Sequence, residues 1–180
     1  MKGIVFTEFL DYVDATLGRD MVDDVLDDCS FPHGGAYTAV GTYDYQEMIA
    51  LVGAVSKRSG KKVPDLLCGF GRHLCGRFAH LYPEFFQNKT CLFDFLESVN
   101  GHIHVEVHKL YPDAELPAFA TNARTNDRLE LDYRSCKPLA SLAEGLIKGA
   151  SDFYSEPIAV SQERREDTGD AFVRFSITHV

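Results

Sequence analysis

The sequence predicts an α+β fold in which a helical N-terminal subdomain precedes a four-stranded antiparallel sheet with one inserted helix. From residue 2 to residue 110, apolar residues recur at intervals of three and four, the period of an amphipathic helix. After Pro117 the period changes to two, which is typical of half-buried strands. One more helical pattern, from Leu139 to Phe153, interrupts these strands. Helices that precede an antiparallel sheet define the α+β class.

The first two helices are predicted from their apolar positions. Apolar residues four apart place the first helix over Lys2–Leu17, with Gly18 as its C-terminal stop. A second, short helix follows. Between its apolar positions lie four aspartates, which we interpret as a solvated face rather than a metal site: Asp23, Asp24, Asp27 and Asp28.

Two further helices carry clear start and stop signals. Asp44 and Glu47 form a predicted capping box for a helix that ends at Gly60. A proline in the first turn opens a longer helix over residues 64–83, where a second proline ends it. Residues 85–87 are predicted to connect this helix to the next.

Residues 101–112 contain three of the chain's seven histidines next to apolar residues. At a period of two, this segment is a strand whose one face presents four possible metal ligands: His102, His104, Glu106 and His108. At helical spacing, an apolar stripe continues into it from the preceding segment: Leu96, Val99, Ile103, Val107 and Leu110. The helix is favoured, because no alternating strand precedes the segment. Asn100-Gly101 then marks a break or an N-cap, and Pro112 ends the helix.

On this helix His104 lies at the edge of the apolar stripe, whereas His102 points elsewhere. A buried and unpaired histidine is a candidate axial ligand of a metal. From spacing alone, a histidine at the edge of an apolar helix face is more often a hydrogen-bonded core residue. The pattern by itself leaves both interpretations open.

Four strands are predicted in the C-terminal part. Pro117–Thr121 and Leu129–Tyr133 form an antiparallel pair joined by the turn-rich residues 122–127. Ile158–Gln162 pairs with the last strand of the chain in a hairpin around Asp167-Thr168-Gly169-Asp170.

Length and composition predict one globular domain over residues 1–180, since no linker or low-complexity run divides the chain. The formal charge of −9 argues against nucleic acid or an anionic membrane as a general partner. An acid at Glu8 comes too early for a signal peptide, and no apolar run approaches the roughly 20 residues that span a bilayer. A cytoplasmic protein is therefore expected. The cysteines form no Cys-x-x-Cys pair, which argues against a zinc site.

Two motifs stand in register with the predicted elements. Tyr133-Arg134-Ser135-Cys136-Lys137 comes just before the inserted helix, and a second motif begins at His104 and reads His-x-Glu-Val-x-Lys-Leu-Tyr. Together they resemble the haem nitric-oxide/oxygen binding family, H-NOX, of the stand-alone bacterial type. The resemblance runs the whole length, from the opening Met-Lys-Gly-Ile, through Leu-Tyr-Pro-Asp-Ala-Glu, to Gly145-Leu146-Ile147-x-Gly149.

The resemblance implies that haem b lies between the helical subdomain and the sheet. His104 would be the only protein ligand of the iron, and the propionates would be held by Tyr133, Ser135 and Lys137. Lys137 stands where the family has arginine, so the charge is kept but the planar two-pronged fork is lost. Pro117 is the expected wedge that distorts the haem.

The resemblance also implies an apolar distal wall, made by Val5, Phe9, Leu74, Phe78, Leu142 and Leu146. Oxygen-binding members of the family carry a tyrosine at the position of Leu142, whose hydroxyl stabilises oxygen. Nitric oxide needs no such donor. The wall therefore favours nitric oxide over oxygen by about one charge-assisted hydrogen bond, roughly 1.5 to 3 kcal/mol.

The predicted function is that of a haem-based nitric oxide sensor, with nitric oxide and carbon monoxide as haem ligands. By resemblance, its ligand state would regulate a separate histidine kinase or a cyclic-di-GMP enzyme, which is a diguanylate cyclase or a phosphodiesterase. The chain contains no enzyme motif and is expected not to be an enzyme. Two alternatives remain: a metalloenzyme that uses His102, His104 and His108 on a strand, and a haem-free adaptor. Only the sensor would show a haem band in visible absorbance.

Overall fold

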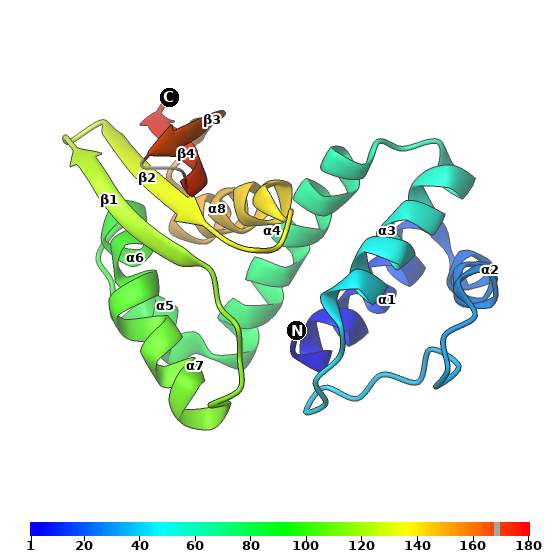
Figure 1. The fold of residues 1–180 in the computed structure, drawn as a ribbon. Coiled ribbons are helices and arrows are strands. Elements are labelled where there is room, and N and C mark those ends of the chain that lie inside the picture. Colours follow the sequence, from blue (N-terminus) through cyan, green and yellow to red (C-terminus); the bar gives the residue numbers. More distant parts are fainter. Residues whose placement is uncertain (168–169) are drawn as a thin grey trace.

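The N-terminal part of the chain consists of three helices: α1 (Gly3–Leu17), α2 (Arg19–Cys29) and α3 (Tyr45–Ser59). Figure 1 shows them together on one side of the computed structural model, which describes residues 1–167 and 170–180. The predicted stop after α1 is confirmed. Gly18 separates α1 from α2 with a φ of 90°, a backbone conformation that favours glycine.

The predicted capping box at the start of α3 is only half formed. The side chain of Asp44 accepts a hydrogen bond from the backbone N–H of Gln46 at 2.9 Å, as an N-cap residue does. The carboxylate of Glu47 does not accept the backbone N–H of Asp44, the second bond of a capping box. It accepts a hydrogen bond from the hydroxyl of Tyr37 at 2.8 Å and lies 2.8 Å from Nε2 of His33. The capping-box prediction is therefore wrong for Glu47, because polar partners from the preceding loop bind its carboxylate.

The centre of the fold is the crossing of two helices that the sequence predicted: α4 (Val63–Leu81) and α8 (Ala140–Tyr154). Glycines allow their backbones to approach closely. A Cβ atom on Gly71 would lie 2.3 Å from the carbonyl oxygen of Leu142, and one on Gly145 would lie 2.1 Å from the carbonyl oxygen of Cys68. Any larger residue at these positions would push the two helices apart.

The histidine-rich segment is helical, so the alternative of a strand with a three-histidine face is wrong. The chain forms two short helices and then a helical run: α5 (Pro83–Gln87), α6 (Leu92–Ser98), a π-helical turn (Val99–Ile103) and α7 (His104–Leu110). Two predictions need correction. Residues 85–87 belong to α5 rather than to a connection, and the chain does not break at Asn100-Gly101. The backbone N–H of His104 instead donates to the carbonyl of Val99, the spacing of a π-helix.

The sheet has four antiparallel strands, as predicted: β1 (Ala118–Arg124), β2 (Arg128–Arg134), β3 (Ile158–Asp167) and β4 (Asp170–His179). Their order is β1-β2-β4-β3, and α8 connects β2 to β3. β1 extends into the predicted turn and its register with β2 shifts between Thr121 and Ala123. β3 continues beyond the predicted Gln162. The predicted turn residues Thr168 and Gly169 lie outside the described part of the chain.

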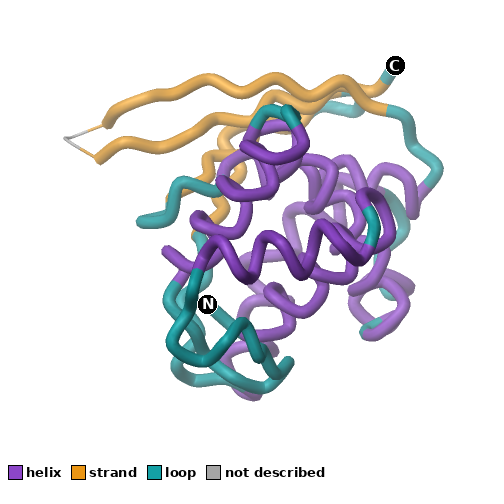
Figure 2. The backbone as a smooth tube through the Cα atoms, turned by 90° about the vertical axis from the view of Figure 1, so that its right-hand side faces the viewer, coloured by secondary structure: helices purple, strands orange, loops and turns teal. Residues whose placement is uncertain are grey.

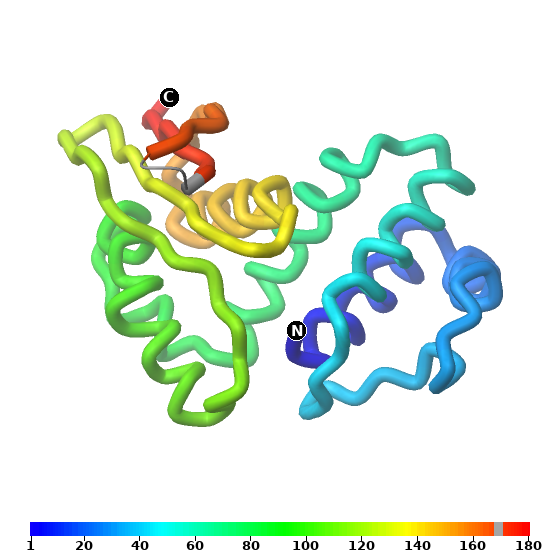
Figure 3. The backbone as a smooth tube through the Cα atoms, in the orientation of Figure 1, coloured from blue at the N-terminus to red at the C-terminus, as the bar shows by residue number. Residues whose placement is uncertain are grey.

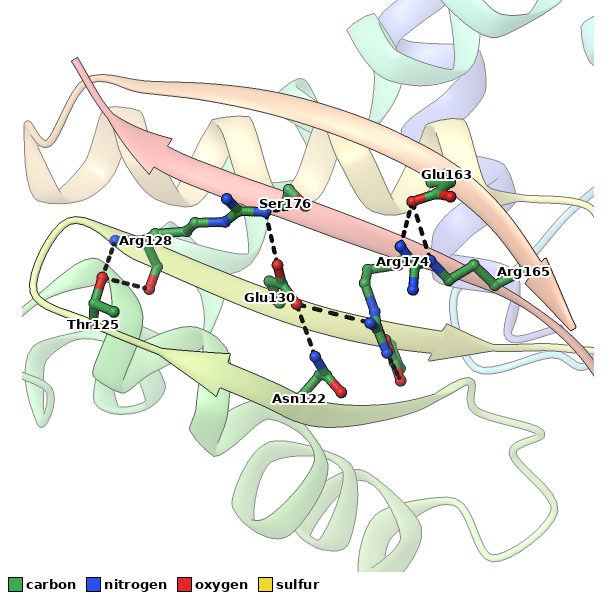
Figure 4. Close-up of polar contacts among 9 residues, drawn as sticks. Asn122, Thr125, Arg128, Glu130, Glu163, Arg165, Arg174 and Ser176 are labelled. Atoms are coloured by element: carbon green, nitrogen blue, oxygen red, sulfur yellow. Dashed lines mark hydrogen bonds and ion pairs between the residues drawn. The ribbon is translucent and has the colours of Figure 1, made fainter. Parts of the chain in front are cut away.

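The helices cover one face of the sheet, as Figure 2 shows. Leu129, Leu131 and Tyr133 of β2 are buried on this face, in agreement with the predicted alternation. The other face is polar (Figure 4): Arg128 bonds Glu130 at 2.7 Å, and a guanidinium nitrogen of Arg174 lies 3.8 Å from the same carboxylate. Among the described helices, none is both long and apolar enough to cross a membrane.

Candidate functional site

A cavity of about 340 Å³ lies where the helical part meets the sheet part, within the size range of small-molecule sites. Its lining comes from α1, from α4 to α8, from β1 and β2, and from the loop after α7. The lining thus joins segments far apart in the chain, from the N-terminus to β2 and α8, whose backbone can be followed in Figure 3. Every residue that the family resemblance implied for the haem site, except Phe9, lines this cavity.

His104, the first residue of α7, lines the cavity and is half-buried. Its Nδ1 atom is buried without a hydrogen-bond partner in the part of the chain that the structure describes. Burial lowers the pKa of His104, and His108 lowers it further, while the backbone of Pro117 opposes the shift. The imidazole is therefore neutral at pH 7, which is the form that binds a metal. Nδ1 of His104 is one of four such histidine nitrogens among the described residues, so its position in the cavity, rather than its lack of a partner, makes His104 the candidate ligand.

The other two histidines of the segment do not join His104. His102 and His108 are exposed, and neither lines the cavity. The ring of His102 instead packs edge-on against Phe85, with 5.9 Å between ring centroids. Among the described residues, no group of histidine, cysteine and acidic side chains is arranged to hold a metal ion.

An apolar wall of the cavity is made by side chains from α1, α4 and α8: Val5, Leu74, Phe78, Leu142 and Leu146. None of these side chains can donate a hydrogen bond. Phe9 does not reach the cavity. It is fully buried in the N-terminal core, where its ring meets that of Phe70 edge-on at 5.1 Å.

The polar end of the cavity is formed at the end of β2. Tyr133, Ser135 and Lys137 all line it. Burial raises the pKa of Tyr133, so its hydroxyl stays protonated and can donate a hydrogen bond. The hydroxyl of Ser135 accepts a hydrogen bond from the backbone N–H of Lys137 at 3.1 Å. Two hydroxyls and one cation therefore lie together at one edge of a mostly apolar cavity.

Lys137 has a partner that the sequence did not predict. Its Nζ lies 3.0 Å from a carboxylate oxygen of Glu115 and donates at 3.0 Å to the backbone carbonyl of the same residue. Glu115 lies in the loop between α7 and β1, which also contains Pro117 at the cavity wall. The only sequence signal for this loop is its position between Pro112 and Pro117.

These features fit a flat, mostly apolar cofactor that carries carboxylates at one edge and an iron ion at its centre. The apolar wall matches the body of such a ring, the polar end matches its carboxylates, and His104 offers a neutral imidazole at the cavity. The fold and the site thus define a class of protein, one whose cavity can take such a cofactor beside a single histidine.

Comparison with known proteins identifies the family. A family model described as Haem-NO-binding matches residues 2–162. An H-NOX protein from K. algicida, in the Fe(II) unliganded state, is 33% identical with a TM-score of 0.92, and the alignment covers 100% of this chain and 97% of that chain. The chain therefore belongs to the H-NOX family, whose domains bind haem and gas ligands and act as sensors rather than as enzymes.

Two other similar structures are less identical in sequence. An H-NOX protein from S. oneidensis in the Fe(II)NO ligation state is 26% identical with a TM-score of 0.90, over 100% of this chain and 99% of that chain. A mutant of the T. tengcongensis H-NOX is 26% identical with a TM-score of 0.88, over 99% of this chain and 97% of that chain. We found no match among curated proteins.

Proposed function

We propose that this chain is a haem-based nitric oxide sensor in which His104 is the only protein ligand to the iron of haem b. The observation that carries the proposal is the position of His104, since no other histidine of the described residues lines the cavity. Haem, when bound, supplies an iron centre with an open position for a diatomic gas. Tyr133, Ser135 and Lys137 would bind the propionates through their hydroxyls and ammonium group.

The choice of gas follows from the apolar wall. Dioxygen at a haem needs a hydrogen-bond donor, which is worth roughly 1.5 to 3 kcal/mol when the bond is charge-assisted, whereas nitric oxide does not. Leu142 supplies none at the position where oxygen-binding relatives carry tyrosine. Three tyrosines of the lining are not part of this wall: the ring of Tyr111 lies under the ammonium of Lys2, at 4.6 Å, Tyr133 belongs to the polar end, and the ring of Tyr82 lies 6.2 Å from that of Phe78. We therefore propose nitric oxide and carbon monoxide as ligands.

The proposed output is regulation of a separate histidine kinase, diguanylate cyclase or phosphodiesterase. A gas can regulate such a partner only if the partner binds two states of the sensor with different affinity. The loop from Tyr111 to Pro117 supports a link between the site and the surface. Its proline lies beside His104, while its Asp113 accepts a hydrogen bond from Thr42 at 2.9 Å on the N-terminal side.

The visible absorbance spectrum of the purified protein tests the proposal. A strong haem band is expected, and His104→Gly should abolish stable haem incorporation unless imidazole is supplied to fill the space. His102→Ala and His108→Ala are matched controls, because these histidines are exposed and outside the cavity. A colourless wild-type protein, or a haem band that survives His104→Gly and disappears in a control, would contradict the assignment.

A further inference from the structure

We propose that Glu115 is a built-in competitor for the propionate site, so that its carboxylate and a haem propionate bind alternately to the ammonium of Lys137. This inference rests on the proposed haem binding. It starts from the contacts of Lys137, whose Nζ meets both the carboxylate and the backbone carbonyl of Glu115 at 3.0 Å. The carboxylate is thus bound to the cation that a propionate would need as its partner.

The two partners differ greatly in exposure. The side chain of Lys137 is 7% exposed and that of Glu115 is 73% exposed. A buried ammonium without an anion is costly, so Lys137 needs a carboxylate at all times. Separation from Lys137 costs Glu115 little free energy, because its exposed carboxylate is then solvated by water. A propionate that enters the cavity can therefore replace Glu115 without leaving the cation unpaired.

The number of donors makes this exchange a competition rather than a sharing. An ammonium group has three N–H donors, and Glu115 engages two of them. One donor remains while Glu115 is bound, so a propionate gains a second N–H···O bond to the ammonium only when the Glu115 carboxylate leaves. An arginine presents five donors in a planar fork and could bind both carboxylates together. The competition thus depends on lysine at position 137.

The loop that carries Glu115 has other ties that do not involve Lys137. Asp113 accepts a hydrogen bond from Thr42 at 2.9 Å and lies 3.7 Å from the ammonium of Lys2. The backbone carbonyl of Glu115 also remains bonded to Lys137 when the side chain leaves. The exchange therefore requires rotation of one exposed side chain and no rearrangement of the loop.

The rate of haem loss to an excess of a haem-acceptor protein, followed by visible absorbance, tests the competition. Glu115→Gln should slow haem loss roughly two- to fivefold, the effect of an ion pair with one exposed partner. The same change in a Lys137→Arg background should have little effect, because arginine accommodates both carboxylates. Glu166→Gln is the matched control: it removes an exposed carboxylate of β3 that does not line the cavity, and it should leave the rate unchanged.

Each other outcome overturns the inference. Faster or unchanged haem loss in Glu115→Gln would show that Glu115 supports the haem or does not meet it. Equal slowing in the lysine and arginine backgrounds would show a general charge effect instead of competition for one cation, as would equal slowing in Glu166→Gln. Absence of a haem band from the wild type and all variants would contradict the proposed function itself, and is thereby distinguished from a failure of the competition alone.

Discussion

Leu142 is the single residue whose side chain bears most directly on the choice of gas. It is 8% exposed and lines the cavity from α8. Leu142→Tyr should place a hydroxyl in the apolar wall and produce a measurable oxygen complex of the ferrous protein, whereas the wild type should form none. One charge-assisted hydrogen bond corresponds to roughly tenfold or more in affinity. Absorbance spectra under controlled oxygen pressure measure the effect.

A second tyrosine provides the control for this prediction. Tyr82 lines the cavity near the wall, with its ring 6.2 Å from that of Phe78. If the wild type binds oxygen stably, the proposed selectivity fails, and Tyr82→Phe then identifies whether this hydroxyl is the donor. If the wild type does not, Tyr82→Phe should leave the gas preference unchanged.

Among the elements, the crossing of α4 and α8 is the most sensitive to side-chain size. Gly145→Ala would bring a Cβ atom to 2.1 Å from the carbonyl oxygen of Cys68. Because backbone atoms cannot move aside cheaply, the change should lower the free energy of unfolding by about 1 to 3 kcal/mol. Urea unfolding of the haem-free protein measures it.

Gly76 on α4 is the matched control for this substitution. A Cβ atom there would meet no atom within 4 Å. Gly76→Ala should therefore stabilise the protein by roughly 0.5 to 1 kcal/mol, since alanine is the better helix former. Equal urea midpoints for Gly145→Ala and the wild type would show that the two helices separate without cost.

At the scale of the whole molecule, the cavity lies where two hydrophobic clusters meet. One cluster is built by α1–α4 with the start of α8, and the other by the sheet with residues of α4, α5, α6 and α8. Both Phe78 and Leu146 pack against each cluster. Both residues also line the cavity. A ligand in the cavity therefore contacts both parts of the fold, and its binding free energy contributes to the stability of the whole.

Haem should accordingly raise the melting temperature of the protein. A ligand that binds only the folded state at a thousand times its Kd adds about 4 kcal/mol, or on the order of 10 °C for a chain of this length. Thermal unfolding with and without haem measures the shift, and His104→Gly should reduce it. An equal melting temperature with and without haem would mean that haem does not bind the folded cavity.

Local patterns in the sequence predicted most of the fold. Apolar residues three and four apart predicted α1–α4 and α8, and the alternation at Leu129, Leu131 and Tyr133 predicted β2 with the correct inward face. These predictions succeed because burial of one face imposes the period of the element on its own residues. The prediction for Glu47 failed because a tertiary contact with Tyr37 binds its carboxylate. The prediction for Asn100-Gly101 failed because the chain continues through this point as a π-helical turn, which the helical period does not indicate.

The site required more than such patterns. Family motifs in the sequence singled out His104 and Tyr133–Lys137, but they could not show that Phe9 is covered by Phe70 and kept out of the cavity. Nor could they show that Glu115 pairs with Lys137, which lies 22 positions further along the chain. Such contacts depend on how the packed elements orient their connecting loops. The residues adjacent in sequence do not determine how distant elements pack, so only the tertiary structure decided these contacts.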